Sequence, residues 1–204
     1  MPAQLLRPND RRREAIVATA TTAFLHGGYA GTSMSAIAAQ LGGSKTTLWS
    51  YFPNKRDLFM AVADALIGQY VDSIIEVLQP GSGLDAALNK LGERLLKALM
   101  SEPIVALMRI VTGEAGRFPE LGDLFHQRGL GYGWNILKEF LDGELERGQI
   151  RAGVDTLRAA QHFIALCQSA SYQRFMLGGA PRPDDHEIVA DVAAATHMFV
   201  AAYC

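Results

Sequence analysis

The sequence lacks the features that mark a secreted, zinc-binding or membrane-spanning protein. Its 204 residues include only two cysteines, Cys167 and Cys204, so we expect neither a disulfide framework nor a cysteine-based zinc site. No apolar run reaches the roughly 18–20 residues that a transmembrane helix needs. Residues 1–10 also contain no apolar core of the kind found in signal peptides. We therefore expect a soluble cytoplasmic protein with no membrane partner.

An excess of charge of one sign is also missing. The chain has 19 Lys and Arg against 21 Asp and Glu, which gives a formal net charge of -2. The charges are unevenly distributed, however: residues 1–60 contain seven basic and three acidic side chains, and the remainder contains twelve and eighteen. A basic N-terminal segment on an acidic body is typical of a two-part DNA-binding protein. Chance clustering of a few charges is the alternative.

Helical periodicity is present along the whole chain, and no segment alternates as a half-buried strand does. A first helix is predicted over 10–26, where Gly27-Gly28 supplies the exit. A short second helix follows, with Thr32 or Ser33 as its N-cap. Further helices are predicted at 45–50, from Lys55 onward, and at 84–101, 103–116, 120–147, 155–177 and 185–203. The expected fold class is therefore all-α.

The third predicted helix has an unusual surface for a structural element. Most of its side chains are polar or amphipathic, and only Leu48 and the following Phe52 are suited to packing. Hydroxyl, lysine and tyrosine groups reach bases and phosphates, so a recognition helix in the major groove needs such a surface. Together with the tight turn Leu41-Gly42-Gly43-Ser44, this pattern predicts a helix-turn-helix.

These residues resemble the DNA-binding domain of the TetR/AcrR family of transcriptional regulators. The resemblance rests on Thr32 to Gly42, on Ser44-Lys45 and on Leu48 to Leu58, and it covers about residues 9–69. Two positions depart from the family pattern: Gly43 replaces a small apolar residue, and Trp49 stands where tyrosine is commoner. The resemblance implies a three-helix DNA-binding domain at 9–69, joined by a long fourth helix to a helical effector-binding and dimerisation domain at 84–204.

The resemblance also implies nine DNA contacts. The first two would bond phosphates, the next four would begin the recognition helix, the two aromatic residues would contact the sugar-phosphate backbone, and the last would place a cation at the start of the fourth helix. They are Thr32, Ser33, Ser44, Lys45, Thr46, Thr47, Trp49, Tyr51 and Lys55. Burial in the core is the alternative for Trp49 and Tyr51. Residues 11–13, all arginine, are either a minor-groove arm or a solvated helix start.

The C-terminal helices are expected to form a twofold dimer, because the last two helices of this family pair between subunits. A looser resemblance of residues 104–121 to one TetR subgroup supports a helical effector domain. The proposed interface is Phe163, Leu166, Ala170, Phe175, Val192, Ala195 and Phe199. The alternative is that these side chains close the core of a single chain.

An effector pocket is expected between the middle helices. Its candidates are mostly apolar, with a few polar companions, a composition that suits an apolar or amphipathic small molecule. They are Met100, Met108, Val111, Glu114, Phe125, Trp134, Asn135, Leu137, Phe163, Cys167, Gln168 and Met176. Plain core packing is the alternative for each, and Cys167 is either an oxidant sensor or an inert core thiol.

The sequence thus predicts a homodimeric transcriptional repressor that a small ligand releases from operator DNA. An activator, or a regulator released by a protein partner, has the same sequence features. An all-helical enzyme with a vestigial helix-turn-helix is disfavoured, because the chain has no phosphate-cradling glycine loop, nucleophile elbow or metal-spaced histidine set. No catalytic residue, cofactor or metal site is expected.

Overall fold

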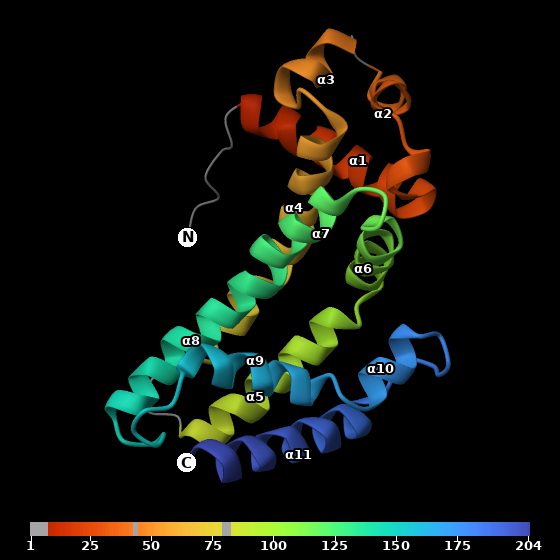
Figure 1. Ribbon diagram of the computed structural model, residues 1–204. Helices are drawn as coiled ribbons and strands as arrows, with labels where there is room; N and C mark the ends of the chain where they lie inside the picture. Colours follow the sequence, from red (N-terminus) through yellow and green to blue (C-terminus); the bar gives the residue numbers. More distant parts are fainter. Residues whose placement is uncertain (1–7, 43–44, 79–82) are drawn as a thin grey trace. The chain divides into compact units, whose positions relative to one another are not determined.

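The protein is built from α-helices joined by short connections (Figure 1). The computed structural model describes residues 8–42, 45–78 and 83–204, and no strand occurs within these ranges, which confirms the predicted all-α class. In chain order the elements are α1 (Pro8–Gly31), α2 (Met34–Gln40), α3 (Lys45–Tyr51), α4 (Lys55–Ile75), α5 (Leu84–Leu99), α6 (Glu102–Glu114), α7 (Pro119–Phe125), the π-helical turn η1 (His126–Leu130), α8 (Gly131–Glu146), α9 (Thr156–Cys167), α10 (Ser171–Met176) and α11 (Asp185–Tyr203).

The chain forms two compact units. The first contains the described residues up to Gly68 together with Ala106–Phe125, and the second contains the described residues of Gln69–Val105 together with His126–Cys204. The span 84–204, taken from the sequence as one domain, is therefore divided between the units. The span is divided because Phe118, within residues 106–125, packs against Tyr29 of the first unit.

The core of the first unit is assembled by helix faces that the apolar spacing predicts. Ile16, Ala20 and Phe24 of α1 are fully buried, and the ring of Phe24 meets that of Phe59 edge to face at 5.2 Å between centroids. Leu48 is buried while its helical neighbours Trp49 and Ser50 are exposed. α3 is thus anchored through one apolar face, and Trp49 and Ser50 remain on the surface.

The first helix does not stop at the predicted glycine pair. Gly28 adopts φ 69° and ψ 173°, which breaks the helical path, and one further turn follows as far as Gly31. Such a positive φ lies in the region that favours glycine. Gly27 has a separate constraint, because a Cβ atom there would lie 2.9 Å from the Thr32 hydroxyl oxygen. Both glycines therefore shape the approach to α2.

The second unit packs α5, α8, α9 and α11 around one apolar core, with α11 alongside α5 (Figure 1). The closest approach is at Gly92 of α5. A Cβ atom at this position would lie 2.6 Å from a methyl carbon of Val192 and 3.2 Å from the sulfur of Cys167. Because Val192 is β-branched and stiff, it cannot easily move aside. The spacing of α5, α9 and α11 therefore depends on the absence of a side chain at Gly92.

The helix predicted over 120–147 is interrupted by the π-helical turn η1. Gly131 directly follows the turn, and an added Cβ atom there would lie 3.0 Å from the carbonyl oxygen of His126. A side chain at this position would crowd the widened turn. Turns of this type occur often at functional sites.

Gly92→Ala is expected to lower the free energy of unfolding by about 1–3 kcal/mol, because the added methyl overpacks the contact between α5 and α11. Urea denaturation of the purified variant measures the change. Gly133→Ala, in α8, is the matched control, since nothing lies within 4 Å of its added Cβ. The control should be about 0.5–1 kcal/mol more stable than the wild type. Equal stability of both variants would contradict the packing argument.

Candidate DNA-binding interface and effector unit

Two neighbouring hydroxyl groups at the start of α2 make different hydrogen bonds. Ser33 is the N-cap, exposed, and its oxygen accepts a hydrogen bond of 3.1 Å from the backbone N–H of Ala36. Thr32 is 6% exposed, and its hydroxyl lies 3.1 Å from the carbonyl oxygen of Ala23 and 2.8 Å from that of Gly28. The Thr32 hydroxyl is therefore engaged inside the unit, and only the Ser33 hydroxyl is on its surface.

The described outer side of α3 consists of residues singled out by the sequence. Trp49 is 37% exposed and Thr47 is half-buried, while Leu48 alone points fully inward. The hydroxyl of Ser50 donates to the carbonyl oxygen of Thr47 at 2.8 Å, within the helix. Three predicted contacts are not covered: Ser44 lies outside the described residues, together with Gly43, and so do the side chains of Lys45 and Thr46.

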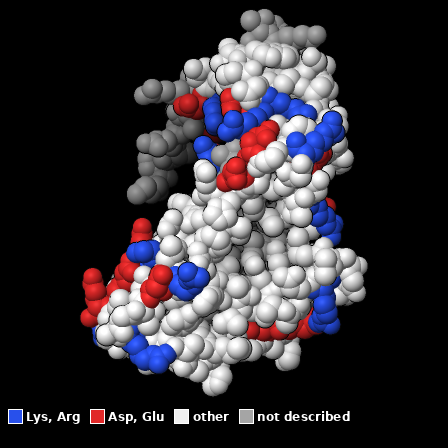
Figure 2. Space-filling model, viewed as in Figure 1, with Lys and Arg blue, Asp and Glu red and all other residues white. Residues whose placement is uncertain are grey.

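Tyr51 joins the end of α3 to the start of α1, a contact that the sequence did not indicate. Its hydroxyl donates to the side-chain oxygen of Asn9, and one turn further along α1 the guanidinium of Arg13 lies 5.2 Å from the centre of the Phe52 ring. Residues 11–13 are therefore part of a helix and not an extended arm. On the face shown in Figure 2, basic and acidic side chains lie beside one another in the first unit.

Lys55 begins α4, and its ammonium group lies 4.5 Å from the centre of the Tyr29 ring. Burial lowers the pKa of Lys55, an effect that the negative charge of Glu114 opposes. The preceding Asn54 caps the helix, because its side-chain oxygen accepts the backbone N–H of Asp57 at 2.9 Å. The sequence pattern indicates Lys55, but it indicates neither the Asn54 cap nor the aromatic ring beneath the cation.

The predicted effector residues do not all fall in one unit. Met108, Val111, Glu114 and Phe125 belong to the first unit, and the other eight belong to the second. The carboxylate of Glu114 already has a partner, because it accepts the backbone N–H of Ala30 at 3.0 Å. Glu114 thus contributes to the internal structure of the first unit.

Within the second unit the candidates separate by burial. Met100, Leu137, Phe163 and Cys167 are essentially inaccessible and belong to its core. The partly accessible ones include Trp134, whose ring meets the imidazole of His126 edge to face at 5.2 Å. Gln168 and Met176 are also half-buried, and Asn135 is exposed. Burial raises the pKa of Cys167 to about 12, so this thiol stays protonated and unreactive near neutral pH.

Four residues of the predicted dimer interface lie in the core of one chain. Phe163, Val192, Ala195 and Phe199 are all at most 3% exposed, so they close the core of the second unit. Leu166 and Phe175 are half-buried and Ala170 is exposed. The exposed apolar side chains of α11 instead include Val189, 46% exposed, and Met198, 56% exposed.

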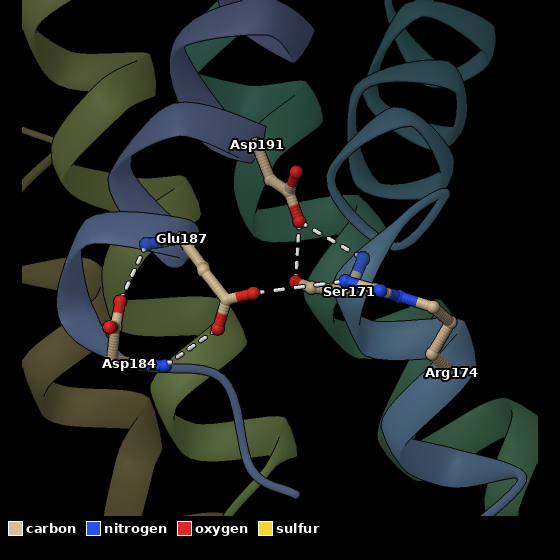
Figure 3. A network of polar contacts seen from close by, with 5 residues as sticks. All are labelled: Ser171, Arg174, Asp184, Glu187 and Asp191. Carbon is tan, nitrogen blue, oxygen red and sulfur yellow. Dashed lines mark hydrogen bonds and ion pairs between the residues drawn. The ribbon is translucent and has the colours of Figure 1, made fainter. Parts of the chain in front are cut away.

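The connection between α9 and α11 is held by a polar network (Figure 3). Asp191 of α11 accepts the backbone N–H of Ser171 at 3.1 Å and also its hydroxyl, which caps α10 from another helix. A reciprocal capping box of Asp184 and Glu187 starts α11, and Arg174 reaches Glu187 at 3.7 Å. This long-range cap explains why the helix predicted over 155–177 is split into α9 and α10.

The described residues contain no group of three His, Cys, Asp or Glu side chains placed to hold a metal ion. They also contain no helix that is both long and apolar enough to cross a membrane.

Two family profiles match this chain. The profile described as the C-terminal domain of AefR-like transcriptional repressors matches residues 86–204. The profile of bacterial regulatory proteins of the tetR family matches residues 16–62, which contain α2, α3 and the beginning of α4. Comparison with curated protein sequences finds no match.

Solved structures with the same architecture include three whose sequences are more than a quarter identical to that of this chain. A TetR-family transcriptional regulator from Mesorhizobium loti superposes with a TM-score of 0.85 at 29% identity, over 97% of this chain and 99% of that one. The flavonoid-responsive regulator FrrA has a TM-score of 0.83 at 29% identity, covering 95% and 97%. A TetR-family regulator from Pseudomonas syringae has a TM-score of 0.71 at 27% identity, covering 95% and 97%.

Proposed function

The chain belongs to the TetR family of bacterial regulatory proteins, and on that premise we propose that it is a homodimeric repressor that a small amphipathic ligand releases from its operator. Family membership makes it a DNA-binding transcriptional regulator and implies that it is not an enzyme. A repressor is favoured over an activator or a partner-released regulator, because the matching C-terminal family is one of repressors. A protein that binds the chromosome works in the cytoplasm, which is the location we propose.

The proposed DNA-binding surface consists of α3 with the starts of α2 and α4. The supporting observation is that α3 is anchored by Leu48 while Thr47 and Trp49 remain accessible. Ser33 and Lys55 would contact phosphates, and Ser44 to Thr47 would read base edges. Trp49 and Tyr51 would pack against the sugar-phosphate backbone. In this proposal Thr32 acts indirectly, because its hydroxyl holds the chain just before α2.

The proposed dimer forms through the outer face of α11. Exposed apolar side chains such as Val189 and Met198 are unfavourable in water, and the exposed alanines between them allow a second helix to approach closely. The inner face of the same helix is occupied by the chain's own core. A twofold axis at this face would pair two copies and so present two recognition helices to a palindromic operator.

The proposed effector is a planar amphipathic aromatic molecule of the flavonoid type, bound in the second unit near η1 and α8. The half-buried Trp134 and the neighbouring His126 offer aromatic surface on which a flat ring can stack. Gln168 and Asn135 are candidate hydrogen-bonding partners for hydroxyl groups. A relative at 29% identity is a flavonoid-responsive regulator, which supports this ligand class.

Operator recognition is tested by fluorescence anisotropy with a duplex that the protein selects from a random library. We expect an affinity at least about a thousandfold above that for a scrambled duplex, falling steeply with salt. Lys45→Ala should weaken operator binding about tenfold or more, because a recognition-helix cation is lost. Lys90→Ala removes an exposed lysine of α5 and should have little effect. Equal binding to both duplexes would refute operator recognition.

Effector release is tested in the same assay by adding quercetin, with palmitate as the aliphatic alternative. Saturating quercetin should lower operator affinity at least about tenfold, a coupling within the ordinary range for allosteric regulators. Trp134→Ala should weaken quercetin binding in calorimetry, and Tyr132→Ala, which truncates an exposed ring of the same helix, should not. An operator affinity unchanged by saturating ligand would count against release. If palmitate alone lowered the operator affinity, the effector class would be aliphatic instead of the flavonoid type.

Met198→Arg is expected to convert a dimer into a monomer, because two buried arginines would face each other near a twofold axis. Analytical ultracentrifugation measures the mass of each variant. Ile75→Arg is the matched control, since Ile75 is a comparably exposed apolar side chain on α4. If Met198→Arg stays dimeric, or if the wild type is monomeric, the two copies do not pair through this face.

A further inference from the structure

The turn between α6 and α7 contacts the DNA-binding helices at a point where the backbone needs a partner. After the break at Gly28, a short helical turn runs up to Gly31, and the first N–H groups of a helix have no partner within it. One of them, the N–H of Ala30, donates to the carboxylate of Glu114 at 3.0 Å. Glu114 thus acts as an N-cap supplied by another element.

The same turn contributes an aromatic contact beside this cap. The ring of Phe118 meets the ring of Tyr29 edge to face, with centroids 5.0 Å apart and planes at 73°. Tyr29 also contacts Phe59 at 5.1 Å and carries the ammonium of Lys55 at 4.5 Å from its centre. Burial raises the pKa of the Tyr29 phenol, so the ring stays neutral beneath the cation. Phe118 therefore limits where Tyr29, and with it Lys55, can lie.

Glu114 and Phe118 are rigidly connected to each other. The carbonyl oxygen of Glu114 accepts the backbone N–H groups of Arg117 at 2.9 Å and of Phe118 at 2.8 Å. The carbonyl oxygen of Phe118 in turn accepts the N–H of Leu121, in the first turn of α7. One closed turn therefore presents both side chains, and the cap and the aromatic contact form together.

We propose that Glu114 and Phe118 are positioning residues for operator binding: Glu114 fixes the segment that leads into α2, and Phe118 fixes Tyr29 as the platform of Lys55. This inference rests on the proposed contact of Lys55 and the α2 start with DNA phosphates. Neither residue touches DNA. Each acts by holding a phosphate-binding group where it is needed, so that the competent arrangement is populated before DNA arrives.

The charge of Glu114 makes its role unusually easy to test. Removing a negative charge close to a DNA-binding lysine should strengthen binding by electrostatics alone. Positioning predicts the opposite for Glu114→Ala, which loses the acceptor for Ala30, and a reduction of operator affinity of about tenfold is expected. Glu114→Gln keeps an acceptor oxygen and should bind as tightly as the wild type or more tightly. Asp123→Asn, on the exposed side of α7, is the matched charge control.

Phe118 is tested through its coupling to Lys55. Phe118→Ala should weaken operator binding about tenfold, and its salt dependence should become shallower, toward that of Lys55→Ala. The double variant should lose less than the product of the two single losses, because both remove the same phosphate contact. Phe118→Tyr keeps the edge-to-face ring and should restore binding, and it remains informative if the alanine variant fails to fold.

The outcomes separate this inference from the proposed function. Positioning is supported by two results together. Glu114→Ala binds the operator more weakly than the wild type while Glu114→Gln does not, and the affinity losses of Phe118→Ala and Lys55→Ala are coupled. If Glu114→Ala binds the operator as tightly as Glu114→Gln does, the inference is overturned while operator recognition stands. The same holds if the affinity losses of Phe118→Ala and Lys55→Ala multiply in the double variant and Phe118→Ala leaves the salt dependence of binding unchanged. If Lys55→Ala binds normally, the premise about Lys55 fails and the role of Phe118 is overturned, while operator recognition stands. If the wild type does not prefer its selected duplex, the proposed function and this inference are both overturned.

Discussion

The DNA-binding part of this protein depends on the packing of the aromatic rings around Tyr29. Phe24 comes from α1, Phe59 from α4 and Phe118 from the turn before α7, and their ring centroids lie 6.0, 5.1 and 5.0 Å from that of Tyr29. Aromatic pairs prefer such edge-to-face and offset contacts, which fix relative orientation as well as distance. Because α3 has only one buried face, its placement depends on the helices that these rings hold together.

The second unit depends on a different constraint, which is the narrow space between two of its helices. Gly92 lets α5 approach α11 so closely that no side-chain carbon would fit between them. Close packing of this kind uses the inner face of α11 completely, so the exposed apolar side chains of this helix lie outside that face. Core and proposed dimer surface are therefore opposite sides of a single helix, and a side chain cannot serve both.

Much of the fold was predictable because it follows from local periodicity and capping. The spacing of Ile16, Ala20 and Phe24 defines the inner face of α1 with no knowledge of its partners. The helix-turn-helix was recognised for the same reason, since its turn, caps and flanking helices are adjacent in sequence. Predictions failed where a residue far along the chain decides the outcome: α9 ends before Ser171 because Asp191 of α11 caps a new helix there.

The amino-acid sequence alone determined the helical class, the family and the chemical character of α3, because each is encoded in residues within a few turns of one another. Only the tertiary structure decided which side chains are free to act. It placed the Thr32 hydroxyl against backbone carbonyls and Phe199 inside the core, and it joined Glu114 to Ala30 across 84 positions of the chain. Periodicity tells which face of a helix is apolar, but it does not tell which partner will cover that face.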